Sequence, residues 1–154
     1  MNTPTGIKKI TDFTDKSLLL VDDDNPFRER LARAMEKKGF DVIQAEGVKK
    51  GIDAVKLKKP AFAVVDLRLN DGNGLEVVKE IQSTNDKSRI VMLTGYGNIP
   101  TAVSAIKEGA IDYMAKPADA DDVEKALLAN PNKKADPPEN PMSADRVKWE
   151  HIHR

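Results

Sequence analysis

The chain has 154 residues, 40% hydrophobic and 32% charged, and its 25 basic residues balance its 25 acidic residues. This composition supports one hydrophobic core of ordinary domain size, and the zero net charge excludes a globally basic nucleic-acid-binding chain. The lack of cysteine excludes disulfides, thiolate catalysis and Cys-based zinc sites. No apolar run approaches the roughly 20 residues of a membrane span, and the first residues contain no apolar signal segment, so we expect a cytoplasmic protein without membrane contact.

Composition divides the chain into four segments. Residues 1–15 are polar and patternless, which indicates a loose tail. Residues 16–129 alternate apolar runs with amphipathic segments and are expected to form the folded domain. Prolines interrupt residues 130–143, which favours an extended linker because proline is excluded from helix interiors. Residues 144–154 have helical character and are expected to begin a further domain.

Five short apolar runs in the folded domain are typical of buried strands. They are Ser17–Val21, Asp41–Gln44, Phe62–Val65, Ile90–Leu93 and Asp112–Met114. Each is followed by a segment whose apolar residues recur at helical spacing. These residues are Phe27, Leu31, Ala34 and Met35, then Val48, Ile52 and Val55, then Leu75, Val78 and Ile81, then Val103 and Ile106, and finally Val123, Ala126 and Leu127.

The ends of the first helix can also be predicted. Asn25 is expected as its N-cap, Pro26 as its first helical residue, and Gly39 as the left-handed residue beyond its end. Five repeats of strand then helix predict an α/β fold. A parallel sheet with right-handed crossovers carries helices on both of its faces.

Side chains with chemical potential follow four of the predicted strands. In open α/β sheets the functional site lies beyond the carboxyl ends of the strands. Asp22 and Asp23 follow the first strand, Asp66 the third, Thr94 the fourth and Lys116 the fifth. If the first and third strands are neighbours, three carboxylates crowd together and need a cation, for which Mg²⁺ with its oxygen ligands is suited. A threonine hydroxyl and a lysine ammonium on the same rim suit the oxygens of a phosphoryl group.

The motifs at these positions resemble the receiver domain of two-component response regulators. They are Leu20-Val21-Asp22-Asp23-Asp24, Val65-Asp66-Leu67, Leu93-Thr94-Gly95 and Tyr113-Met114-Ala115-Lys116-Pro117. The resemblance covers residues 16–129. It implies a flavodoxin-like fold, a doubly wound five-stranded parallel sheet with the strand order 2-1-3-4-5.

The resemblance also implies how the pocket works. Asp66 would be the phosphoacceptor, a carboxylate nucleophile that takes a phosphoryl group from a sensor histidine kinase. The domain would be no enzyme in the usual sense, since it catalyses only its own phosphorylation and dephosphorylation. Asp22, Asp23 and Asp66 would hold Mg²⁺ with the backbone carbonyl of Arg68. Lys116 would pair with the phosphoryl oxygens, with a cis peptide bond to the proline that follows it.

Further roles follow from the same resemblance. Thr94 and Tyr113 would form the conformational switch, in which the threonine moves toward the phosphoryl group and the tyrosine turns inward behind it. Arg68 and Tyr96 would flank the path of the attacking water and so modulate the lifetime of the phosphoryl group. No other cofactor is implied.

The C-terminal segment from Asp136 to Ile152 is similar to the linker and effector start of the Reg/Prr/Act type of redox-responsive global regulators. In that type a small helix-turn-helix domain follows the receiver. The chain stops at Arg154, before any recognition helix, so we expect a shortened form without sequence-specific DNA binding. Promoter DNA would be bound through the C-terminal domain of the longer parent, and a phosphorylation-dependent homodimer stays open.

Two other classes were weighed against this interpretation. A Mg²⁺-dependent aspartyl-phosphate phosphohydrolase has a similar topology, but its motif needs Thr or Val where Pro26 stands. A non-phosphorylated binding module of the same fold, or a flavin carrier, is the second alternative. Degenerate receivers of that kind lose residues of the acidic pocket. This sequence retains all five, which are Asp22, Asp23, Asp66, Thr94 and Lys116.

Overall fold

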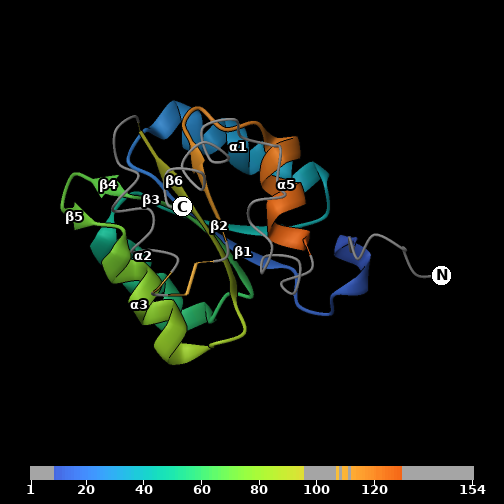
Figure 1. The fold of residues 1–154 in the computed structure, drawn as a ribbon, viewed down its shortest axis with the longest axis horizontal. Coiled ribbons are helices and arrows are strands. Elements are labelled where there is room, and N and C mark those ends of the chain that lie inside the picture. Colours follow the sequence, from blue (N-terminus) through green and yellow to red (C-terminus); the bar gives the residue numbers. More distant parts are fainter. Residues whose placement is uncertain (1–8, 96–106, 108, 111, 130–154) are drawn as a thin grey trace, which may run out of the picture. The chain divides into compact units, whose positions relative to one another are not determined.

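The computed structural model describes residues 9–95, 107, 109–110 and 112–129. Within these residues five parallel strands form one sheet in the order β2-β1-β3-β6-β7 (Figure 1). The strands are β1 (Ser17–Val21), β2 (Asp41–Ala45), β3 (Phe62–Asp66), β6 (Arg89–Thr94) and β7 (Asp112–Ala115). Counted within this sheet the order is 2-1-3-4-5, so the predicted doubly wound α/β fold is confirmed. Each strand matches the expected range or extends it by one residue, and β6 extends it by one residue at both ends.

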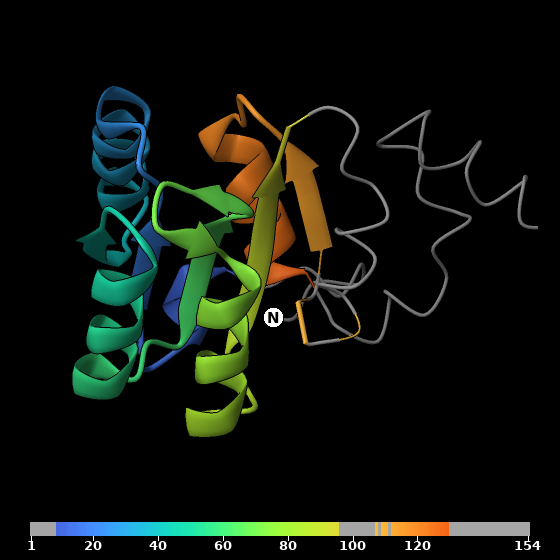
Figure 2. The ribbon, with the colours of Figure 1, turned by 90° about the vertical axis from the view of Figure 1, so that its left-hand side faces the viewer.

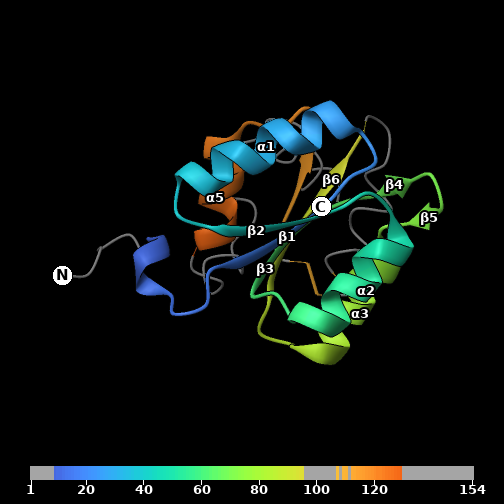
Figure 3. The same cartoon turned by 180° about the vertical axis from the view of Figure 1, so that it is seen from behind.

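The helices of the described residues cover both faces of the sheet. They are α1 (Asn25–Lys37), α2 (Val48–Lys58), α3 (Leu75–Thr84) and α5 (Ala120–Leu128). Helices α1 and α5 lie on one side of the strands, and α2 and α3 lie on the other (Figures 2 and 3). The helix expected around Val103 and Ile106 lies outside the described residues.

The core consists of two layers separated by the sheet. Leu18 and Leu20 of β1 pack toward α1 and α5, whereas Leu19 and Val21 pack toward α2 and α3. Strand β3 is buried along its whole length. Strands buried on both faces read as continuous apolar runs rather than as alternating ones, which is why the sequence marks them clearly.

The start of helix α1 differs from the prediction by one residue. Asp24, not Asn25, is the N-cap, and its Oδ1 accepts a hydrogen bond of 3.1 Å from the Phe27 N–H. Asp and Asn cap helices about equally well, so adjacent candidates cannot be separated by residue type. The predicted end is confirmed, because Gly39, with φ of 110°, lies just beyond the helix.

The expectation of a loose tail over residues 1–15 is wrong for residues 10–13. Ile10–Asp12 form a short 3-10 helix, and Ile10 is buried. The Phe13 ring meets the Phe62 ring edge-on at a centroid distance of 5.1 Å, and the guanidinium of Arg89 lies 5.2 Å from the Phe13 centroid. Ile10 and Phe13 therefore cover the core at the amino end of β3.

A small hairpin that the sequence did not predict follows β3. Strand β4 (Arg68–Leu69) pairs antiparallel with β5 (Gly72–Asn73), and the hairpin leads into α3 (Figure 1). Among the described residues, no helix combines the length and apolar character that a bilayer crossing requires.

Candidate functional site

Three carboxylates meet at the carboxyl edge of the sheet. Asp22 follows β1 and is fully buried, Asp23 is half-buried, and Asp66 ends β3 with 5% of its surface exposed. Strands β1 and β3 are paired neighbours. One oxygen atom from each carboxylate lies within 4.8 Å of the other two. The predicted crowding of these acids is confirmed.

The backbone fixes two of the acids. The Asp22 N–H donates to the Ala45 carbonyl at 3.1 Å, so this residue continues the pairing of β1 with β2. Its Oδ1 accepts a hydrogen bond of 2.8 Å from the Asp24 N–H at the start of α1. The Asp66 Oδ1 accepts from the Arg68 N–H at 3.3 Å. Short turns after the strands thus aim both carboxylates at the same place.

Lys116 brings a positive charge to the two buried acids. Its Nζ lies 3.2 Å from Asp66 Oδ2 and 3.0 Å from Asp22 Oδ2. The backbone N–H of Lys116 donates to the Thr94 carbonyl at 3.0 Å, which ties the loop after β7 to the end of β6. Its peptide bond to Pro117 is cis, as the resemblance implies. The ring of Phe27 lies beside the ammonium, with 4.9 Å from Nζ to the ring centroid.

The charges at the site shift the protonation of these groups. Burial, followed by repulsion from Asp22, raises the pKa of Asp66 to about 6, although Lys116 acts in the opposite direction. Burial alone would lower the pKa of Lys116, but its hydrogen bonds and attraction to Asp22 and Asp66 raise it above the ordinary value. The site therefore stabilises the Lys116 ammonium strongly and holds more negative charge than this one ammonium balances.

The donor set fits a hard divalent cation. The buried Asp22 Oδ2 makes an ion pair with Lys116 but finds no hydrogen-bond partner among the described residues, so it is available to a further cation. Three carboxylates of the described residues converge here, and carboxylate oxygens are the ligands that Mg²⁺ and Ca²⁺ prefer. Bound at this position, such an ion would relieve the repulsion that raises the pKa of Asp66.

The remaining predicted residues differ in burial and in the strands that carry them. Thr94 ends β6 beside β3, is buried, and donates its hydroxyl to the Gly95 carbonyl at 3.1 Å. Tyr113, opposite Met92 in the pairing of β7 with β6, is half-buried against the core layer of α2 and α3. Arg68 is exposed in β4, and Tyr96 lies outside the described residues.

Arg28 is a residue of this region that the sequence interpretation missed. It is 8% exposed, its Nη1 donates to the Asp22 carbonyl at 2.7 Å, and its Nε donates to Gln44 Oε1 at 2.9 Å. The buried Arg28 therefore fixes the backbone of Asp22, the most deeply buried of the three acids. Its signal was present in the sequence, because position 28 shares the buried face of α1 with Leu31 and Met35.

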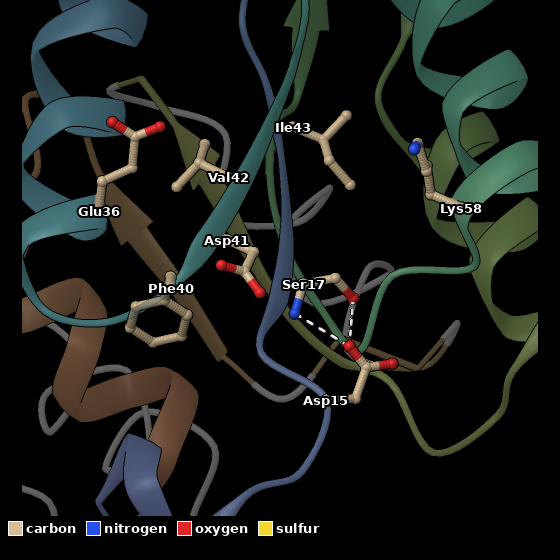
Figure 4. Close-up of a pocket in the computed structure, with 8 residues that line it drawn as sticks. All are labelled: Asp15, Ser17, Glu36, Phe40, Asp41, Val42, Ile43 and Lys58. Carbon is tan, nitrogen blue, oxygen red and sulfur yellow. Dashed lines mark hydrogen bonds between the residues drawn. The ribbon is translucent and has the colours of Figure 1, made fainter.

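Surface cavities among the described residues include one at each end of the sheet. One of about 630 Å³ lies at the amino ends of β1 and β2, where Asp15 accepts hydrogen bonds from the Ser17 N–H and hydroxyl (Figure 4). It lies at the opposite end of these strands from Asp22. The other, of about 450 Å³, is lined by Asp23 and Asp71 among others and adjoins the acidic cluster. The three carboxylates and the second cavity thus lie at the same edge of the sheet.

Comparisons with known proteins agree with this geometry. The family model described as "Response regulator receiver domain" matches residues 18–128. The chain is 60% identical over 140 residues to the acid tolerance regulatory protein ActR of Rhizobium meliloti, covering 91% of this chain and 72% of that protein. It is 61% identical over 141 residues to the photosynthetic apparatus regulatory protein RegA of Rhodobacter capsulatus, covering 92% and 77%.

A solved structure is similar as well. It is a response regulator protein from Burkholderia pseudomallei, described with a phosphorylated aspartic acid, a calcium ion and citrate. The TM-score is 0.73 at 37% sequence identity, with 91% of this chain and 83% of that chain covered.

Proposed function

Since the chain belongs to the response regulator receiver domain family, and within it to the ActR and RegA type, we propose that it accepts a phosphoryl group on Asp66. The observation that carries this proposal is the position of Asp66. It ends the central strand β3, its carboxylate is within 4.8 Å of oxygens of Asp22 and Asp23, and its Oδ2 is 3.2 Å from Lys116 Nζ.

Phosphoryl transfer to Asp66 exchanges one bond to phosphorus for another. A carboxylate oxygen of Asp66 attacks the phosphorus of a phosphohistidine on the kinase, the new O–P bond forms, and the P–N bond breaks. The leaving imidazole nitrogen takes up a proton from solvent water. Asp66 must be ionised for the attack, and its pKa of about 6 leaves most of it ionised at neutral pH. Lys116 then lies where it can pair with an oxygen of the transferred group.

Asp22, Asp23 and Asp66, with the backbone carbonyl of Arg68, would hold Mg²⁺. When bound, this ion would supply charge neutralisation to the phosphoryl oxygens. The calcium ion described in the Burkholderia pseudomallei regulator supports a hard divalent cation in this class of site. The convergence of oxygen ligands in this chain supports the same assignment.

Phosphorylation would be read out through Thr94 and Tyr113. Thr94 ends the strand next to β3, and Tyr113 on the neighbouring β7 is only half-buried, so the tyrosine has room for a second arrangement. A phosphoryl group that hydrogen-bonds the threonine in one arrangement shifts the balance of the two. Arg68 and Tyr96 would modulate how long the phosphoryl group survives by flanking the path of water.

The relatives support a signalling context for this chain. We assign the phosphodonor role to a sensor histidine kinase and the output to a C-terminal DNA-binding effector that controls transcription in the cytoplasm. The names of ActR and RegA as regulatory proteins support this output. A phosphorylation-dependent homodimer is part of the same proposal. These relatives favour a receiver over a phosphohydrolase or a non-phosphorylated binding module, which supports a domain that catalyses only its own phosphorylation and dephosphorylation.

The proposal is tested by incubating the chain with Mg²⁺ and acetyl phosphate, followed by intact-mass measurement. We expect one added phosphoryl group in the wild type and none in Asp66→Asn. An unmodified wild type, under conditions that label another receiver, would contradict the proposal. Sustained turnover of phosphate monoesters would instead support the phosphohydrolase.

A further inference from the structure

One side chain attaches the tip of the β4–β5 hairpin to the start of helix α2. The Val48 N–H donates to Asp71 Oδ1 at 2.8 Å, and the Lys49 N–H donates to Asp71 Oδ2 at 3.2 Å. The first N–H groups of a helix lack partners within the helix and need outside acceptors. The N-cap of α2 is Gly47, which makes no side-chain cap hydrogen bond. Asp71 therefore caps α2 from a separate loop.

The glycine at the N-cap makes room for this contact. A Cβ at Gly47 would lie 2.7 Å from Asp71 Oδ1, closer than real contacts allow. Its φ of −169° is extended backbone that any residue adopts, so space is the reason for glycine here. The two N–H donors hold the pKa of Asp71 below its ordinary value, so the cap is charged at neutral pH.

The base of the same hairpin is attached to the phosphoacceptor. The Gly74 N–H donates to the Leu67 carbonyl at 2.8 Å, and the Leu67 N–H donates to the Leu93 carbonyl at 2.8 Å. The Arg68 N–H reaches Asp66 Oδ1 at 3.3 Å. The hairpin is thus fixed to β6 and β3 at its base, through the N–H groups of Leu67 and Arg68, and to α2 at its tip, through Asp71.

We propose that Asp71 is a positioning residue for the phosphoacceptor site, acting through the hairpin backbone at Arg68. This inference rests on the proposed function, which assigns the Arg68 carbonyl to the metal. Asp71 and Asp23 also line the same 450 Å³ cavity, so the cap lies on the rim of the acidic cluster. Loss of the cap frees the tip of the hairpin and loosens the ligand that it carries. Partners that hydrogen-bond directly to metal ligands commonly change metal affinity about 10- to 100-fold when removed, and Asp71 acts one step further out, so the effect should lie near the lower end of that range.

A purely structural cap would behave differently from a positioning residue. It would lower the stability of the metal-free protein and leave the Mg²⁺ dissociation constant unchanged. A positioning residue changes the dissociation constant, whatever it does to stability. The two roles are therefore separated by measuring Mg²⁺ binding and metal-free melting on the same variants.

The experiment uses the full chain with Asp71→Ala, Asp71→Asn and Gly47→Ala. The matched control is Asp53→Ala, which removes an exposed aspartate of α2 whose carboxylate is 3.5 Å from Lys49 Nζ. Mg²⁺ dissociation constants come from amide NMR titrations, and hydrogen exchange of the Val48 and Lys49 amides reports the cap itself. Each variant's spectrum verifies its fold, and Gly47→Ala breaks the contact while keeping Asp71.

We expect Asp71→Ala and Gly47→Ala to speed exchange at both amides and to raise the Mg²⁺ dissociation constant about tenfold. Asp71→Asn retains one oxygen acceptor, so its constant should lie between that of Asp71→Ala and the wild type. Asp53→Ala should match the wild type. Unchanged Mg²⁺ binding in Asp71→Ala and Gly47→Ala, with a wild type that binds Mg²⁺ and is phosphorylated, overturns the inference and leaves the proposed function standing. A wild type that binds no Mg²⁺ overturns both.

Discussion

Lys116 Nζ lies 3.2 Å from Asp66 Oδ2 and joins the loop after β7 to the end of the central strand. The same ammonium is 3.0 Å from Asp22 Oδ2, so one lysine is shared by two buried carboxylates. The half-buried Asp23 adds a third negative charge nearby. The metal-free site therefore carries more negative than positive charge, and its carboxylates repel one another.

The stability of the metal-free protein should depend on the protonation of Asp66. Its folded pKa of about 6 exceeds the ordinary 3.8, so the folded state binds this proton more tightly than the unfolded chain does. This contribution to stability is fully present below about pH 4 and is lost as the pH rises through about 6. Asp66→Asn cannot ionise, so in the absence of metal it should melt above the wild type near neutral pH, and the difference should shrink toward pH 4.

Thermal melting of both proteins in a chelator, across that pH range, measures this effect. Equal melting temperatures at neutral pH would contradict the repulsion that we ascribe to the site. A difference that widens on acidification would contradict its sign.

Magnesium should stabilise the fold by linkage. A ligand that binds only the folded state adds RT ln(1 + [L]/Kd), which is about 1.4 kcal/mol at ten times Kd. Asp23→Asn removes a half-buried carboxylate of the cluster and should lose most of this increment. Denaturant unfolding with and without millimolar Mg²⁺ provides the measurement. A wild type indifferent to Mg²⁺ would exclude the metal assignment.

Removing the lysine should push the protonation of Asp66 further. Lys116 lowers the pKa of Asp66 through charge and a hydrogen bond, so Lys116→Met should raise that pKa above its wild-type value of about 6. Carbon-13 NMR of the Asp66 carboxyl against pH reports it directly. Lys49→Met is the control, because that lysine is exposed and pairs with Asp53. A pKa that stays unchanged in Lys116→Met would mean that the ion pair is absent in solution.

The turn into α3 should tolerate no side chain. A Cβ at Gly74 would lie 2.1 Å from the Asp66 carbonyl oxygen, which is backbone and cannot swing away. Gly74→Ala should therefore cost about 1–3 kcal/mol of unfolding free energy and shift the phosphoacceptor. Gly95→Ala is the comparison, since its Cβ would meet no atom within 4 Å in the described residues. Equal unfolding free energies for the two variants would contradict the close approach.

The strands and the acidic edge could be predicted because their signals are local. Strand β3 is buried along its length, so its sequence is a continuous apolar run that ends in Asp66. Parallel strands deliver their carboxyl ends to one edge, which places Asp22 and Asp66 together once β1 and β3 are neighbours. Strand order came from the family resemblance, because apolar patterning alone does not say which strands pair.

Other features depend on contacts between distant residues. Ile10 and Phe13 look unremarkable in a polar segment, and Phe13 packs between the Phe62 ring and the Arg89 guanidinium, which are distant from it in the sequence. Asp71 caps a helix whose first residue is Val48, and no periodicity connects the two positions. Such pairings are set by the folded topology, whereas residue type at a single position leaves several partners open.

The central claim is tested most directly by locating the phosphoryl group. After incubation with acetyl phosphate and Mg²⁺, borohydride reduces an acyl phosphate to an alcohol, and peptide mass spectrometry identifies the converted residue. The account predicts conversion of Asp66 to homoserine, with Asp22 and Asp23 unchanged and no conversion when Mg²⁺ is removed by a chelator. Conversion at another aspartate, or phosphorylation that persists in Asp66→Asn at the wild-type level, would contradict it.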